Sequence, residues 1–230
     1  VDAAIAAYEL ATRRDETRQA AYANIALLRL SQADVERAAE ALRQASAGGG
    51  AEDAMVHGAY GELHSARRDW QSATTSYRAA LSLAPSMPMA WLGLMRSAAM
   101  TGGRAPAEAV LDEWLTADPR SSPAWNERGL LHYGDGKHDA AIEAIEKAVA
   151  LDAGNHEAAN NLAWVYAETG RDLARARDLV GAVIASSPTP AAYDTLAYIE
   201  QEAGNLPEAI AAIERATAMD PQNAEYRKRQ

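Results

Sequence analysis

The chain has 230 residues, of which 48% are hydrophobic, and carries a formal net charge of −10. It contains no cysteine, which excludes disulfides, thiolate metal sites and cysteine nucleophiles. No apolar run approaches the roughly 20 residues that a membrane-spanning helix needs, and no signal-peptide pattern is found. The acidic balance argues against a general nucleic-acid binder, because such a protein needs a basic surface to meet phosphates. We expect a soluble chain, cytoplasmic or periplasmic.

A pattern of 34 residues recurs along the sequence and is clearest from Pro190 to Pro221. Apolar residues there follow the i, i+3, i+4, i+7 spacing of one helix face, once before Gly204 and once after it. Glycine suits the left-handed residue that ends a helix, and Pro221 stops the second helix. Small alanines at fixed positions let the two helices approach closely. The pattern therefore predicts an antiparallel helix pair, with Pro190 as position 1 of the repeat.

In chain order, the opening residues 1–18 fit the second half of a repeat, so the natural chain is expected to extend further N-terminally, or this helix serves as a cap. Six full repeats follow, and residues 224–230 begin a further first helix. The expected core positions of the second helices are 20, 24 and 27. The full repeats are 19–53, 54–87, 88–121, 122–155, 156–189 and 190–223.

Several departures from the pattern make local predictions. Position 15 is glycine in four repeats but Ala33 and Arg68 in the first two, where the turns must be built differently or be strained. Trp114 stands where alanine is expected, so its repeat should pack more widely. An extra residue is expected near Asp172. The run Ala47–Gly50 predicts a loose joint, because glycine disfavours helix, and Asp53 is a candidate N-cap.

The period and the small and large residues at positions 8, 20 and 27 resemble the tetratricopeptide repeat. The resemblance implies an all-α solenoid, a right-handed superhelix of stacked helix pairs forming one domain, with the first helices lining a concave groove. It implies a scaffold for protein–protein interaction. The carboxylate clamp of some family members is not expected here, because no Lys or Arg occupies positions 2, 5 or 6 of a full repeat. Few lysines and abundant alanine and arginine indicate a GC-rich bacterial source.

No catalytic or cofactor motif is found: the sequence lacks a phosphate-binding loop, an HExxH pair and a nucleophile elbow. His57 and His64 are seven residues apart on one helix face, and His138 lies near Asp135 and Asp139. We interpret the first pair as packing residues and the second group as a solvated turn, although a metal site was the sharper alternative. We therefore expect no enzyme activity, no metal and no cofactor.

Partner binding is expected along the stripe of the first helices that neighbours the core positions. In the N-terminal half this stripe is aliphatic and methionine-rich, which suits adaptable apolar contacts. In the C-terminal half it combines aromatic anchors, amides and carboxylates, the usual makeup of a peptide-binding surface. The candidate partner-binding residues are Met55, Met89, Leu92, Arg96, Asn126, Glu127, Tyr133, Glu157, Asn160, Asn161, Trp164, Glu168, Asp194, Tyr198, Gln201 and Glu202.

Charge suggests what the C-terminal half of the groove binds. Residues 122–230 carry 10 Lys and Arg against 17 Asp and Glu. The hypothesis is that this half takes a basic peptide or amphipathic helix of a partner protein. The alternatives are that Trp164 and Tyr198 merely pack between neighbouring helices, and that the carboxylates are a solvated acidic face.

Two rival functions remain open at this point: an interaction region belonging to a larger enzyme, and a homo-oligomeric assembly module. The run Asn160–Trp164, with Asp194–Ala197 one repeat later, resembles repeats of bacterial envelope proteins that assist pilus assembly or polysaccharide export. Fold resemblance does not by itself transfer function.

Overall fold

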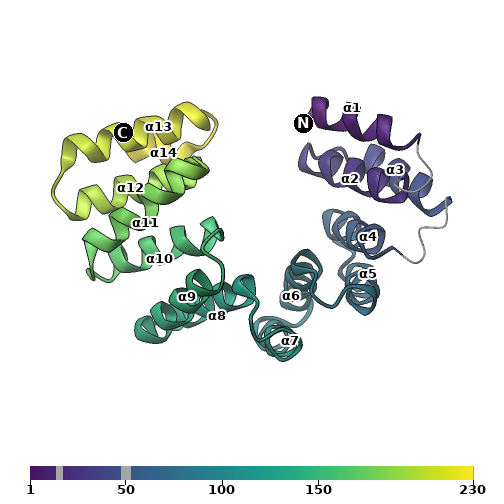
Figure 1. The fold of residues 1–230 in the computed structure, drawn as a ribbon, viewed down its shortest axis with the longest axis horizontal. Helices are drawn as coiled ribbons and strands as arrows, with labels where there is room; N and C mark the ends of the chain where they lie inside the picture. The colour runs from purple at the N-terminus through teal and green to yellow at the C-terminus, as the bar shows by residue number, and fades with distance from the viewer. Residues whose placement is uncertain (14–17, 48–52, 230) are drawn as a thin grey trace. The chain divides into compact units, whose positions relative to one another are not determined.

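The computed structural model describes residues 1–13, 18–47 and 53–229, and within these ranges the chain is helical and has no strand (Figure 1). The predicted Ala47–Gly50 joint falls largely outside the described residues. None of the described helices combines the length and apolar character of a membrane span. The helices are α1 (Asp2–Ala11), α2 (Arg18–Ser31), α3 (Val35–Ala47), α4 (Ala54–Ala66), α5 (Trp70–Leu83), α6 (Pro88–Gly102), α7 (Arg104–Ala117), α8 (Ser122–Gly134), α9 (His138–Leu151), α10 (His156–Glu168), α11 (Leu173–Ser186), α12 (Pro190–Glu202), α13 (Leu206–Met219) and α14 (Ala224–Arg229).

The architecture is an all-α solenoid of helix pairs, and it divides into two compact units, Val1–Pro119 and Arg120–Gln230. The first unit contains α1–α7 and the second contains α8–α14. Within each unit, each first helix packs against its own second helix, and neighbouring first helices also meet, α2 with α4, α4 with α6, α8 with α10 and α10 with α12. The expected grouping of all repeats into one domain stays a prediction.

The first helices begin where the sequence supplies a cap. The Asp53 carboxylate accepts a hydrogen bond from the backbone N–H of Met55 at 2.8 Å, which confirms its predicted N-cap role for α4. Asn155 caps α10 at 3.0 Å, and Thr189 caps α12 at 3.1 Å. Each side chain satisfies a backbone donor that the first turn of a helix leaves without a partner.

The turns inside the pairs share one conformation whether or not they contain glycine. Ala33 has φ 59° and Arg68 has φ 60°, close to the 65° of Gly170. In each case the next backbone N–H bonds the carbonyl five residues back, as Asp34 N–H bonds Arg29 O at 2.9 Å. Of the two predicted outcomes, the Ala33 and Arg68 turns are therefore strained, because a Cβ disfavours the left-handed region.

The turn of the third full repeat departs from that conformation, whereas the turn of the fifth keeps it at Gly170 and adds a second left-handed residue. In the third full repeat, Gly103 and not the predicted Gly102 takes the positive φ, at 78°, because α6 continues one residue further. In the fifth full repeat, the extra residue predicted near Asp172 is present: Asp172 itself is left-handed, with φ 33°, and caps α11 through Arg175 N–H at 3.0 Å.

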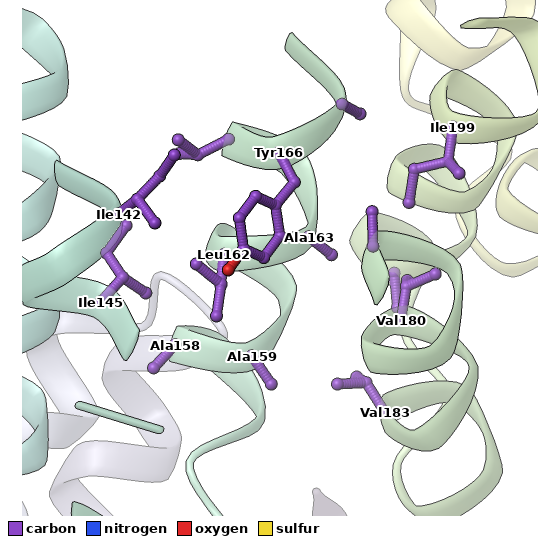
Figure 2. Close-up of a cluster of buried hydrophobic side chains, with 14 of the residues drawn as sticks. Ile142, Ile145, Ala158, Ala159, Leu162, Ala163, Tyr166, Val180, Val183 and Ile199 are labelled. Carbon is purple, nitrogen blue, oxygen red and sulfur yellow. The ribbon is translucent and has the colours of Figure 1, made fainter. Parts of the chain in front are cut away.

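The core lies between the two helices of each pair, and the predicted positions of the second helices fill it. Trp114, the residue at an expected alanine position, is 1% exposed and stacks on Trp91 with ring centroids 6.1 Å apart. Figure 2 shows the equivalent layer of the second unit, where Leu162 and Tyr166 of α10 lie between Ile145 of α9 and Val180 of α11. In the first four full repeats, positions 20, 24 and 27 are all buried: Ala38, Leu42, Ala45, Ala73, Tyr77, Ala80, Ala107, Leu111, Trp114, Ala141, Ile145 and Ala148.

The strain in the two non-glycine turns makes a stability prediction. Replacing Ala33 or Arg68 by glycine removes the Cβ clash, and we expect each change to raise the free energy of unfolding by about 0.5–1 kcal/mol after the entropic cost of glycine. Urea unfolding followed by circular dichroism measures it. Gly136→Ala is the matched control: its φ is 71° and no atom lies within 4 Å of the added Cβ, so strain alone should destabilise it. A lower stability of Ala33→Gly would contradict the account.

Candidate protein-binding face

Three aromatic residues of successive first helices gather in the second unit. Tyr133 of α8 and Trp164 of α10 lie with ring centroids 4.8 Å apart and planes at 62°, an edge-on geometry that aromatic pairs favour. Tyr198 of α12 is linked to them through Glu168, which sits one turn after Trp164 on α10. We call the set Tyr133, Trp164, Glu168, Tyr198 and Glu202 the acidic aromatic face. All three aromatic side chains are half-buried, whereas both carboxylates are exposed.

The electrostatics of this face are those of uncompensated negative charge. The neighbouring Glu168 carboxylate, burial and the charge of Glu202 raise the pKa of Tyr198 to about 12. Burial and the Glu168 charge also raise the pKa of Tyr133. Within the described part of the chain, neither Glu168 nor Glu202 forms an ion pair. The face therefore attracts a cation that this unit does not supply.

An asparagine layer supports the same helices. Asn126 of α8 is 2% exposed, and its Oδ1 accepts a hydrogen bond from Asn161 Nδ2 of α10 at 3.0 Å. Asn126 is a predicted partner-binding residue, but it is buried and links two first helices through this hydrogen bond. The neighbouring Asn160 Oδ1 is buried and has no hydrogen-bond partner among the described residues. An unsatisfied buried acceptor costs about 1–3 kcal/mol, so this layer is not optimised for stability alone.

Glu127 is the most perturbed carboxyl of the predicted set. Burial, and secondarily the charge of Glu157 on α10, raises the pKa of Glu127 from 4.5 to about 7. Glu157 is exposed, so it adds negative charge at the end of the face, while Glu127 changes charge near neutral pH.

The remaining predicted residues of this unit lie on α12. Asp194 is half-buried and Gln201 is exposed. Gln201 and Tyr198 line a cavity of about 270 Å³ whose opposite wall is α13, and Leu206 and Ile210 in that wall are 60% and 49% exposed. Sequence reasoning missed this apolar wall, although both residues occupy positions where an amphipathic surface helix usually carries polar side chains.

In the first unit, predicted groove positions of three successive first helices meet around a cavity of about 490 Å³. Arg96 is exposed at its rim, as predicted for a groove residue. Met55, Met89 and Leu92 are half-buried and do not line this cavity, and the terminal methyl of Met89 lies against Gly58, where an added Cβ would be 2.7 Å away. The lining residues are Leu27, Leu30, Ser31, Glu62, Ser65, Ala66, Trp70 and Arg96.

A tyrosine of the second-helix layer reaches the floor of this cavity. Tyr77 was predicted as a core residue and is buried, yet its hydroxyl donates to Glu62 Oε1 at 2.7 Å. Gly61 and Gly93 leave room for the Tyr77 ring. An added Cβ would lie 2.3 Å from the ring at Gly61 and 2.1 Å from it at Gly93. The sequence contained a signal for this placement of the Tyr77 hydroxyl, because Gly61 and Gly93 both lie against this one large second-helix residue.

Two of the histidines, His64 and His138, lie against tyrosine rings. His64 stacks on Tyr60 with centroids 6.2 Å apart, and His138 lies 5.3 Å from Tyr133. The described residues contain no group of three or more His, Asp or Glu side chains placed to hold a metal ion.

Comparison with known proteins follows the repeat pattern. Two sequence profiles, both described as tetratricopeptide repeat, match residues 132–199 and residues 59–122 with 195–230, together more than half of the chain. The BBSome complex member BBS4 homolog of Drosophila melanogaster is 25% identical over 130 residues, which are 55% of this chain and 27% of that protein. The chain thus spans about a quarter of that relative.

Solved structures share the fold. A chain of the APC/C hetero-tetramer Cut9–Hcn1 has a similar fold, with a TM-score of 0.73 and 13% sequence identity. The aligned region covers 96% of this chain and 44% of that chain. PilW, described as a widely conserved type IV pilus biogenesis factor, has a similar fold, with a TM-score of 0.62 and 17% sequence identity. The aligned region covers 91% of this chain and 97% of PilW. At these identities the likeness establishes the fold alone.

The raised pKa of Glu127 makes a pH prediction. Since its folded pKa is about 7 and its ordinary value is 4.5, the folded chain holds a proton that the unfolded chain has lost between these pH values. The stability contributed by neutral Glu127 is therefore present below pH 4.5 and is lost as pH rises through 7. Glu127→Gln should match the wild type at pH 4.5 and be more stable at pH 8, by on the order of 1 kcal/mol.

Urea unfolding of both proteins at pH 4.5, 6 and 8 measures the difference. Glu214→Gln, an exposed carboxylate of α13, is the control and should show no such trend. A stability difference for Glu127→Gln that does not change with pH would contradict the assignment.

Proposed function

The chain belongs to the tetratricopeptide repeat family, and on that premise we propose that it is a non-catalytic scaffold that docks a basic segment of a partner protein. The docking surface is the acidic aromatic face of the second unit. The observation that carries the proposal is the coincidence there of aromatic rings and unpaired carboxylates on three successive first helices. Aromatic anchors within a charged rim are typical of protein-binding hot spots.

Charge supports a basic partner. The predicted partner-binding residues of the second unit include the exposed carboxylates of Glu157, Glu168 and Glu202, and Arg and Lys are absent from that set. A basic peptide or the basic side of an amphipathic helix would gain long-range attraction during approach. Its apolar side chains would find the half-buried aromatic rings and the neighbouring cavity of about 270 Å³ beside Tyr198.

The first unit offers a second place for the same partner, of different chemistry. Its cavity has an aliphatic wall from Leu27 and Leu30 and polar groups from Glu62 and Arg96. It suits an apolar side chain flanked by polar groups, and we propose it as a subsidiary contact.

A narrower proposal concerns the setting. The run Asn160–Trp164 resembles repeats of bacterial envelope proteins, and PilW, a neighbour in fold, is described as a pilus biogenesis factor. We propose envelope assembly or secretion, of pili or exported polysaccharide, as the process that the scaffold serves. Self-association and membership of a larger enzyme stay predictions.

The docking proposal is tested by affinity capture from the source organism. The double variant Trp164→Ala/Tyr198→Ala removes both anchors, and we expect it to lose partner affinity by about tenfold or more, because hot-spot aromatics contribute on the order of 2 kcal/mol each. Raising salt from about 50 to 500 mM should also weaken binding to the wild type.

The control is Leu10→Ala/Leu83→Ala, which truncates two exposed apolar side chains of the first unit and should leave capture unchanged. Equal recovery of the same partners by the wild type and by Trp164→Ala/Tyr198→Ala would refute the assignment of this face. Salt-independent binding would refute its electrostatic part.

A further inference from the structure

The chain builds one arrangement of tyrosine, glutamate and arginine twice. In the first unit, Tyr77 of α5 donates its hydroxyl proton to Glu62 Oε1 of α4 at 2.7 Å. Arg96 of α6 closes the group: its Nη2 donates to the two Glu62 carboxylate oxygens at 3.0 and 2.9 Å and to the Tyr77 hydroxyl at 3.1 Å. The carboxylate charge is thus neutralised by an arginine from the next helix pair.

The second group lies in the other unit and has the same parts. Tyr166 of α10 donates to Glu146 Oε1 of α9 at 2.5 Å. Arg175 of α11 pairs with the same oxygen at 2.8 Å, and its guanidinium carbon lies 5.4 Å from the centre of the Tyr166 ring. Arg175 therefore neutralises the Glu146 carboxylate and also lies over the Tyr166 ring, which a planar guanidinium can do at the same time.

A third tyrosine–glutamate pair lacks its arginine. Glu168 follows Trp164 by one turn on α10, and Glu202 follows Tyr198 by one turn on α12. Both carboxylates act electrostatically on the Tyr198 hydroxyl. Tyr133 and Trp164 supply the aromatic surface, with centroids 4.8 Å apart. In the described part of the chain no Lys or Arg pairs with Glu168 or Glu202, so two carboxylates beside three rings have no counter-charge.

We propose that an arginine side chain of the partner protein completes this third group, its guanidinium pairing with Glu168 and Glu202 and lying against the Trp164 and Tyr133 rings. The inference rests on the proposed docking function and specifies its central contact. It makes Glu168 and Tyr198 the residues that determine specificity on the acidic aromatic face.

Arginine, and not lysine, is the cation that the chain's own geometry favours. Both completed groups use arginine, which can donate in parallel to carboxylate oxygens and stack on a ring. Lys137 and Lys228 each pair with one exposed carboxylate, and Lys147 Nζ lies 3.6 Å from the centre of the Trp125 ring, so no lysine joins a tyrosine–glutamate pair among the described residues. Two carboxylates beside an edge-on aromatic pair match the fork of a guanidinium better than one ammonium group.

The test is a nuclear magnetic resonance titration of the full ¹⁵N-labelled chain with short peptides. The probes are three hexapeptides in which alanine alternates with arginine, lysine or citrulline, the last being a neutral shape match for arginine. The readout is the indole N–H signal of Trp164, assigned by its disappearance in Trp164→Phe. We expect the arginine peptide to shift this signal, the lysine peptide to bind several-fold more weakly, and the citrulline peptide to have no effect.

Variants connect the signal to the proposed group. Glu168→Gln should weaken the arginine peptide on the order of tenfold, the loss expected for one charged hydrogen-bonded pair. Tyr198→Phe keeps the ring and removes the hydroxyl that interacts with Glu168, so it should reduce the preference for arginine over lysine. Glu214→Gln, an exposed carboxylate on α13, should leave both affinities unchanged.

Equal binding of the arginine and lysine peptides, or full affinity in Glu168→Gln, would overturn the inference. The failure of the docking proposal has a different signature. If Trp164→Ala/Tyr198→Ala loses its protein partner while the peptides show no arginine preference, the docking function stands and the arginine contact does not. If the double variant keeps its partner, the docking function itself fails.

Discussion

Close approach of each second helix to its first helix is the constraint on which the rest of the structure depends. The contact needs a small residue wherever a large one arrives from the other helix. Gly129 shows how small: a Cβ there would lie 2.3 Å from Ile145 Cγ1, nearer than atoms can approach. Because this seam uses one side of every first helix, the neighbouring stripe is left for side chains that the fold does not need.

That division explains why polar groups collect where they do. Tyr77 fills the seam with its ring yet delivers its hydroxyl to Glu62, since two glycines open a passage through the first-helix layer. Arg96, from the next helix pair, then neutralises the Glu62 carboxylate. A similar link joins neighbouring pairs elsewhere, where Arg177 of α11 holds the buried Glu200 of α12 at 2.6 Å and lowers its pKa. The acidic aromatic face departs from this pattern because its carboxylates have no such partner within the described chain.

Sequence periodicity predicted the helices and their seam well, because position within a repeat decides which residues face a partner helix. It identified Ala33 and Arg68 as turns that are either built differently or strained, and their positive φ values show that they are strained. The candidate face was harder. Asn126 belongs to the expected stripe but is buried by its bond to Asn161, which depends on side-chain pairing between repeats and not on period. The Tyr77 hydroxyl and the exposed Leu206 and Ile210 were missed, because binary patterning does not show where a long side chain ends.

The claim that the second unit binds its partner on the acidic aromatic face is tested most directly by site-specific photo-crosslinking. A photoreactive phenylalanine analogue placed at Tyr198 would lie on the face, and the same analogue at Glu214 of α13 is the exposed control. We expect irradiation in the source cells to join position 198, and not position 214, to one partner protein, through a peptide that contains arginine. Adducts of equal yield from both positions, or none from position 198 while the partner is still captured, would contradict the account.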